Sequence, residues 1–231
     1  LSSPGGGAVL GPRTSATVSI YTTGSAPCDI TFRASSANII SGTITIDADK
    51  QLCIEPGAVV QFSGNGSLQS YGRITAIGTP LQRIVFSSDN VFPNRIDLGG
   101  RMDVENAEIR VPINVDPGAT LSVKQSNFGA HGTVMTFSGL ATSGPRFVTL
   151  ENVVFDSNDP TQSYNAQLYA SGLYLVARNI TFRNSAFFNL NVSVFKIDNL
   201  VSENSPVEGL SFSQNTIQPR SEEHTSELQS H

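Results

Sequence analysis

Hydrophobic and polar residues alternate with a period of two along almost every apolar stretch of the chain. The alternation is clear over residues 43–46, 73–77 and 120–123. Short β-branched runs of this kind, separated by Gly, Asn, Asp and Pro, are typical of strands joined by turns. The pattern therefore predicts an all-β protein. An all-β sandwich would alternate in the same way, so the pattern alone does not choose the architecture.

An internal repeat in the second half of the chain narrows this choice. Five segments begin with an apolar residue, continue with a charged residue and then have Asn or Gln: 104–109, 123–128, 150–155, 177–182 and 197–202. The first four end on Ile or Phe, and the fifth ends on Ser202. Their starts are separated by 19, 27, 27 and 20 residues. A period of about 20 to 50 residues indicates a solenoid, whose repeats bury their apolar faces by stacking.

The amide residue of each repeat predicts a ladder. In a stack of coils these five residues would lie one above another: Asn106, Gln125, Asn152, Asn179 and Asn199. Side-chain amides in such a row can pair from one coil to the next and satisfy one another's donors and acceptors. The alternative is that Asn is simply a common turn residue. Because the five are in register, we favour the ladder.

A second motif occurs twice. The segment Ile54-Glu55-Pro56-Gly57-Ala58 returns as 115–119, with the sequence Val-Asp-Pro-Gly-Ala. Pro presets its own φ and Gly accepts a positive φ, so the Pro-Gly pair suits the two central positions of a type II turn. Each copy is followed by alternating apolar residues, which predicts a corner between two strands.

The order of residues from Ile54 through Tyr71-Gly72 to Ile84-Val85-Phe86 resembles the right-handed parallel β-helix repeat of the pectate-lyase-like superfold. The resemblance is dense over residues 40–90 and looser over 100–210. It implies a right-handed parallel β-helix over residues 14–217, truncated at both ends, with residues 1–13 as a linker or the start of a cap. The expected core is Ile44, Ile46, Val60, Phe62, Leu68, Ile74, Ile84, Phe86, Leu121, Val123, Phe128, Phe155, Phe182 and Phe195.

The two cysteines, Cys28 and Cys53, are 25 residues apart, which is about one coil. Equivalent residues of stacked coils lie about 4.8 Å apart, within the reach of a disulfide. We expect that disulfide, and with it an oxidising, extracellular or cell-surface location; two free buried thiols are the alternative. Glycosylation sequons begin at Asn65, Asn179 and Asn191 and are weak signals, since the ladder would bury Asn179.

Residues 220–231 resemble the translation of a short-read sequencing adapter in one reading frame. We therefore treat residues 218–231 as a non-native or disordered tail. Two of the three histidines, His224 and His231, lie in this tail, so His131 is the histidine that remains for chemistry.

The sequence matches the catalytic patterns of enzymes of this superfold only weakly. Lyases of this superfold use clustered carboxylates to hold Ca²⁺ and an Arg as base, and the nearest equivalents are Asp156, Asp159 and Arg183. We favour an ordinary polar turn as the explanation of the two aspartates, so we predict no metal site, with Ca²⁺ only if the chain is an enzyme. Hydrolases of the superfold have an adjacent Asp pair and a nearby His-Gly. His131-Gly132 is present but no Asp-Asp is, which favours a loop histidine.

Three tyrosines form a candidate binding surface. Tyr164, Tyr169 and Tyr174 lie close together in sequence, and exposed aromatic rings can stack on sugars or anchor a protein partner. The alternative, which we favour, is that Tyr174 packs against a neighbouring coil while Tyr164 lies on a loop.

Composition excludes some functions. The net charge of −5 provides no basic surface for nucleic acid, and no apolar run is long enough to span a membrane. Strong fold signals with few convergent ionisable groups predict a non-catalytic extracellular module with a structural, adhesive or ligand-presenting role, whose partner is a glycan or an extracellular protein. The alternative is a polysaccharide-active enzyme, either a lyase or a glycoside hydrolase.

Overall fold

A parallel β-helix without α-helices makes up the part of the chain that the computed structural model describes, which is residues 27–89, 94–135, 145–157, 166–171, 173–184, 187–191, 194–203 and 210–213. Every strand pairing within these ranges is parallel. The architecture confirms the predicted all-β solenoid and is consistent with the right-handed repeat that the sequence resembles.

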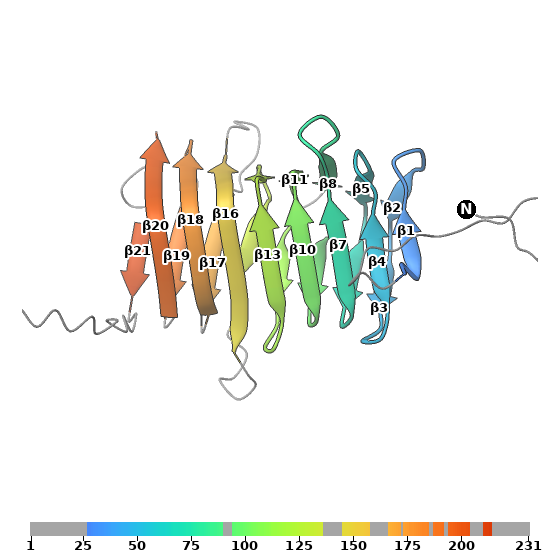
Figure 1. Cartoon of the computed structure of the whole chain (residues 1–231), viewed down its shortest axis with the longest axis horizontal. Coiled ribbons are helices and arrows are strands. Elements are labelled where there is room, and N and C mark those ends of the chain that lie inside the picture. The colour runs from blue at the N-terminus through green and yellow to red at the C-terminus, as the bar shows by residue number, and fades with distance from the viewer. Residues whose placement is uncertain are drawn as a thin grey trace, which may run out of the picture.

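The strands form two sheets, of thirteen and eight strands, which wrap one elongated core (Figure 1). The first arm of the large sheet contains β1 (Ile30–Phe32), β4 (Gln51–Ile54), β7 (Arg73–Ile77), β10 (Arg101–Glu105) and β13 (Thr120–Lys124). Its second arm contains β2 (Asn38–Ile40), β5 (Val59–Phe62), β8 (Ile84–Ser88), β11 (Ala107–Ile109) and β14 (Asn127–Phe128). Both arms pair with β16 (Arg146–Asp156), which is followed by β18 (Leu173–Arg183) and β20 (Val194–Glu203).

The eight-stranded sheet closes the coil on the other side. It contains β3 (Thr43–Ile46), β6 (Ser67–Ser70), β9 (Arg95–Leu98), β12 (Ile113–Val115), β15 (Thr133–Met135), β17 (Gln167–Ser171), β19 (Phe187–Asn191) and β21 (Leu210–Ser213). In Figure 1 the first arm and its continuation through β16, β18 and β20 face the viewer, and β17 and β19 lie behind this continuation.

Alternate residues along a strand point their side chains into the core. β16 shows this most fully, because buried and exposed residues alternate from Arg146 to Leu150. Twelve of the fourteen predicted core residues are fully or almost fully buried. Ile44 is a partial correction, since it is only partly buried at the edge of the core beside the first coil, and the side chain of Phe195 lies outside the described residues.

The five repeated segments found in the sequence lie in register with one another in the large sheet. Its five starting residues are successive partners across β10, β13, β16, β18 and β20: Val104, Val123, Leu150, Ala177 and Ile197. The apolar residues five positions later also stack, so that the ring centroids lie 4.7 Å apart for Phe128 and Phe155 and 4.8 Å apart for Phe155 and Phe182. Ser202 follows Phe182 in register and ends the aromatic stack.

Both Pro-Gly motifs form the predicted turns, but at different corners. Gly57 and Gly118 have φ values of 81° and 85°, and the residues after them donate to Glu55 O and Asp116 O across the turn. The first turn joins β4 to β5 within the large sheet, whereas the second joins the eight-stranded sheet to β13. The same local chemistry therefore bends the chain at two non-equivalent places.

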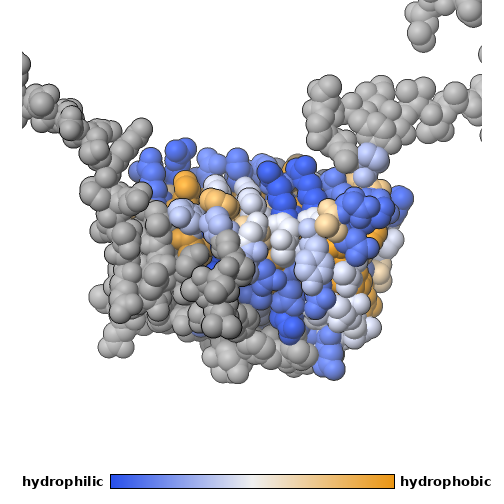
Figure 2. All heavy atoms as spheres, turned by 90° about the horizontal axis from the view of Figure 1, so that it is seen from below, coloured by the Kyte–Doolittle hydropathy of each residue, from blue (hydrophilic) through white to orange (hydrophobic). Residues whose placement is uncertain are grey.

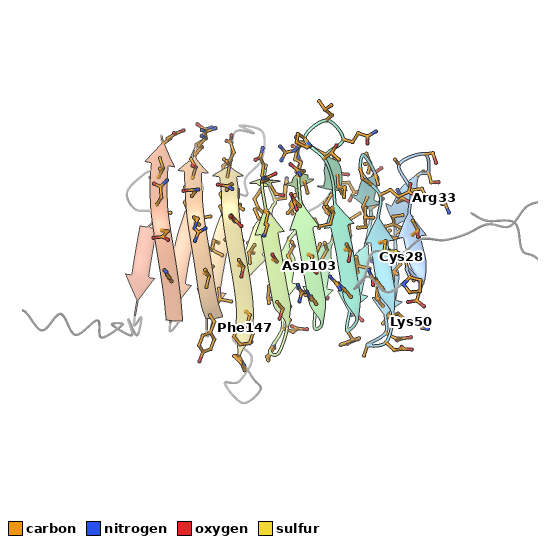
Figure 3. All side chains as sticks on the ribbon, viewed as in Figure 1. Cys28, Arg33, Lys50, Asp103 and Phe147 are labelled. Carbon is orange, nitrogen blue, oxygen red and sulfur yellow. A yellow bond between two sulfur atoms is a disulfide. The ribbon has the colours of Figure 1, made fainter. Side chains whose placement is uncertain are left out.

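Cys28 and Cys53 form a disulfide with a Cα–Cα distance of 5.7 Å. The two are not equivalent positions of adjacent coils, because the register partner of Cys53 is Thr31. Cys28 precedes β1 and reaches Cys53 from outside the strand. Asp29 next to it accepts hydrogen bonds from the Gln51 backbone N–H (2.9 Å) and Lys50 Nζ (3.4 Å). These contacts hold the segment before β1 against the second coil (Figure 3).

Candidate functional site

The amide ladder follows the corner at which the two arms of the large sheet meet. All five of its residues have φ between 47° and 60°. Asn179 Nδ2 donates to Asn152 Oδ1 at 2.8 Å, and Asn199 Nδ2 donates to Asn179 Oδ1 at 3.1 Å. In an earlier coil Asn106 Nδ2 instead donates to the backbone oxygen of Gly78, at 3.2 Å. The last three coils are thus joined by side-chain amides, and the earlier coil is joined by an amide-to-backbone bond.

The left-handed backbone explains why these positions hold Asn or Gln. An L-residue in this conformation loses about 1–2 kcal/mol through its Cβ, and Asn recovers part of that by local hydrogen bonding. The expectation that the ladder buries Asn179 is wrong, because Asn152, Asn179 and Asn199 are all exposed. In these three coils the amides stack on the outside of the bend, whereas Asn106 in the earlier coil is buried.

One column of charged residues on the first arm and its continuation alternates in sign. The charge column consists of five register partners: Glu105, Lys124, Glu151, Arg178 and Asp198. Lys124 Nζ lies 3.4 Å from Glu151 Oε2, and Arg178 Nε lies 4.0 Å from Asp198 Oδ2. Parallel stacking places each charge directly over the next, so equal signs would repel and alternating signs attract.

Asp103 joins two guanidinium groups from adjacent coils. Arg73 Nη2 and Arg101 Nε both lie 2.9 Å from its Oδ2. Burial favours the neutral acid, but the hydrogen bonds and charges of Arg101 and Arg73 outweigh it and lower the pKa of Asp103. Arg73 and Arg101 also border an open groove of about 500 Å³, together with Tyr71 and Gly100. A Cβ at Gly100 would overlap the backbone oxygens of Tyr71 and Gly72, so glycine is required for this close approach of coils.

A pair of carboxylates that sequence reasoning missed lies on the eight-stranded sheet. Asn114 Nδ2 is 3.3 Å from Asp97 Oδ1 and 3.4 Å from Asp116 Oδ1, so one amide bridges two acids. Arg95 Nε donates to both oxygens of Asp97, at 3.0 and 2.8 Å. Burial, reinforced by the negative charge of Asp97 and opposed by Arg146, raises the pKa of Asp116. One acid is thus paired with an arginine, and the pKa of its neighbour is raised.

The bridging amide is itself unusual. Asn114 is 8% exposed, and its Oδ1 is buried without a hydrogen-bond partner. Asp97 and Asn114 are register partners only 17 residues apart, which is shorter than any spacing in the five-segment repeat. Aligning the strands around Ile96 and Ile113, instead of the Asn repeat, would have placed Asp97 beside Asn114.

The predicted catalytic candidates occupy one end of the strands but are engaged with neighbouring coils. Asp156 and Arg183 are register partners on β16 and β18. Asp156 Oδ1 accepts from Asn184 Nδ2 at 2.8 Å, and Arg183 Nε donates to Glu203 Oε2 at 2.6 Å. His131 lies after β14 with a φ of 70°. Asp159 lies outside the described residues, and within them no group of three or more His, Cys, Asp or Glu side chains is placed to hold a metal ion.

The three tyrosines do not form one described surface. Tyr164 lies outside the described residues, and Tyr169 lies on β17 of the eight-stranded sheet. Tyr174 lies on β18 of the large sheet and is 47% exposed. Its ring contacts that of Phe147 on β16, with centroids 5.4 Å apart. Tyr174 therefore packs on a neighbouring coil, as we favoured, and keeps half of its surface in solvent.

No family model, no curated protein and no solved structure matches this chain. Among the described residues there is no helix that could span a membrane. The function of these surfaces is therefore argued from their own chemistry.

Substitutions at Asn152 test the ladder. We expect Asn152→Ala to lower the free energy of unfolding by about 1–2 kcal/mol, because it removes the bond from Asn179 and leaves a Cβ in the left-handed conformation. Asn152→Gly should cost less and Asn152→Val more, as measured by urea denaturation. Asn127→Ala, at an exposed strand position, is the control and should change stability by less than about 0.5 kcal/mol. Equal effects of Asn152→Ala and the control would contradict the ladder.

The two aspartates with opposite pKa shifts predict opposite pH dependence. Asp103, whose pKa is lowered, stabilises the fold above the usual Asp range near pH 3.9, and that contribution is lost as the pH falls through its folded pKa. Asp103→Asn should therefore cost about 1 kcal/mol at pH 7, since its arginines are partly solvated, and less in acid.

Asp116 behaves in the reverse sense. Because its pKa is raised in the folded state, Asp116 contributes to the stability of the fold at a pH below the usual Asp range. This contribution is lost as the pH rises through the folded pKa. Asp116→Asn should therefore be neutral or stabilising at pH 7, and this gain should disappear in acid. Thermal denaturation of both variants at several pH values measures the difference, and parallel pH profiles for the two variants would refute the assignment.

Proposed function

We propose that the chain is a non-catalytic module of an extracellular or cell-surface protein, with a structural, adhesive or ligand-presenting role. The observation that carries this proposal is the use of polar side chains along the axis of the solenoid. The amide ladder, the charge column and the Arg73–Asp103–Arg101 group all join one coil to the next. Side chains employed in this way stiffen a rod and are not free to act on a substrate.

Location outside the cell is supported by the Cys28–Cys53 disulfide. Disulfides persist in oxidising compartments and are rare in the cytosol. A solenoid also suits a spacer or display role, because its stacked coils expose long flat faces.

A polysaccharide-active enzyme is the second candidate, and the Asp97–Asn114–Asp116 group favours it. Glycoside hydrolysis uses two carboxyl groups, one ionised and one protonated. The group supplies two neighbouring carboxyl groups in different surroundings: Asp97 is paired with Arg95, and Asp116 has a raised pKa. In this alternative Asp116 acts as the general acid and Asp97 as the carboxylate.

An activity assay separates the two candidates. The purified chain is incubated with acidic and neutral polysaccharides, with Ca²⁺ or with a chelator, and both new reducing ends and unsaturated products are measured. We expect no turnover above the buffer control.

Variants make the assay decisive. Cleavage that is abolished by Asp116→Asn but kept in Asp156→Ala and His131→Ala would replace our proposal with a hydrolase at the eight-stranded sheet. Cleavage that needs Ca²⁺ and is lost in Asp156→Ala would instead indicate a lyase.

A further inference from the structure

An apolar patch interrupts the polar face of the large sheet. Phe147 on β16 and Tyr174 and Val176 on β18 are 46%, 47% and 53% exposed. They lie on the outward side of adjacent strands, in which Phe147 pairs with Tyr174 and Thr149 pairs with Val176. On the side of the molecule that Figure 2 shows, polar residues cover much of the described surface. A cluster of exposed large apolar residues on a flat face indicates a contact surface.

The charge column borders this patch on the same face. Along β16 the outward residues are Phe147, Thr149 and Glu151, and along β18 they are Tyr174, Val176 and Arg178. Figure 3 shows Phe147 at the lower end of β16 in the sheet that faces the viewer. A shallow hollow of about 140 Å³ lies between Glu151, Val176 and Lys196. The face is thus aromatic at one end of each strand and charged at the other.

This face is complementary to itself. Consider a two-fold axis that lies in the contact plane, parallel to the strands and midway between β16 and β18. Rotation about this axis keeps the position of each residue along its strand and reverses the order of the coils. It places Phe147 over Tyr174 of the second copy and Thr149 over Val176. Because the charge column alternates in sign, the same rotation places Glu151 over Arg178. One coil further out, Lys124 lies over Asp198.

We propose that this face, formed by β13, β16, β18 and β20, binds a second copy of the chain in a symmetric face-to-face dimer. A two-fold interface requires a surface patch that matches itself, and the observed order of charges satisfies that requirement. The Phe147–Tyr174 contacts would lie at one end of the strands and the opposite-charge pairs at the other, so the interface would combine apolar burial with charge pairing. The proposal goes beyond the non-catalytic role and holds whether or not the chain has activity.

The dimer is expected to be weak. Four coils at about 4.8 Å and six residues at about 3.3 Å give a contact of roughly 400 Å² per copy. That is below the roughly 800 Å² per partner of a standard interface. The charged rim should make association stronger at low salt.

The test is analytical ultracentrifugation of the full chain over a concentration series at low salt. We expect the wild type to form dimers at high concentration. Glu151→Lys places a cation opposite Arg178 of the second copy, and Arg178→Glu places an anion opposite its Glu151, so each variant alone should be monomeric. An equimolar mixture of the two variants should dimerise again, because both charge pairs are then restored in the mixed dimer.

Controls keep this test specific. Phe147→Ser should abolish the dimer, and Lys50→Glu, at the other end of the same sheet, should leave it unchanged. Thermal denaturation verifies that each variant is folded, and the mixing experiment cannot succeed with unfolded chains.

Three results would overturn the proposal. The first is a wild type that stays monomeric at all concentrations. The second is dimers that persist in both single charge variants, which would place the contact at the ends of the solenoid. The third is a monomer that binds a glycan through Tyr174, which would show that the patch serves a sugar.

Discussion

Parallel in-register stacking is the constraint on which the rest of this structure depends. Each residue of the large sheet lies directly above its counterpart in the preceding coil, at a spacing of about 4.8 Å. Side chains at equivalent positions of successive coils therefore form columns, and the neighbours within each column must be compatible in size and charge. The inward column of Phe128, Phe155 and Phe182 gains stacked rings. The charge column avoids repulsion by alternating in sign.

The same constraint explains the corners. Where the two arms meet, a single left-handed residue turns the chain, and β16 and β18 stay in the same register on both sides of it. Asn tolerates that conformation and presents an amide that donates in one direction and accepts in the other. The ladder is therefore the result of one backbone requirement repeated once per coil, and its amides add hydrogen bonds along the axis.

The repeat of the second half was predictable because coils with the same corner residue keep the same order of side chains. Segments such as 150–155 and 177–182 could be aligned by eye, and their alignment is the register. The acid pair could not be found in this way. Asp97 and Asp116 are separated by a shorter coil and a different corner, and they are brought together only when the eight-stranded sheet forms.

The disulfide shows a related limit. The spacing of Cys28 and Cys53 indicated adjacent coils, but Cys28 joins Cys53 from before β1, three residues short of the register partner Thr31. Spacing along the chain gives the number of coils between two residues. It does not give their position around a coil, because corner lengths vary. The same holds for a functional site on a solenoid, because its residues come from several coils.

Cysteine cross-linking measures the register most directly. Thr149→Cys and Val176→Cys, introduced together, occupy register partners on β16 and β18, with Cα atoms at the roughly 4.8 Å spacing that a disulfide accepts. The account predicts that this pair oxidises to an intramolecular disulfide, detected by mass spectrometry of a digest, whereas Thr149→Cys with Arg178→Cys, two residues out of register, does not. Efficient cross-linking of the second pair and none of the first would contradict the stacking on which every other conclusion depends.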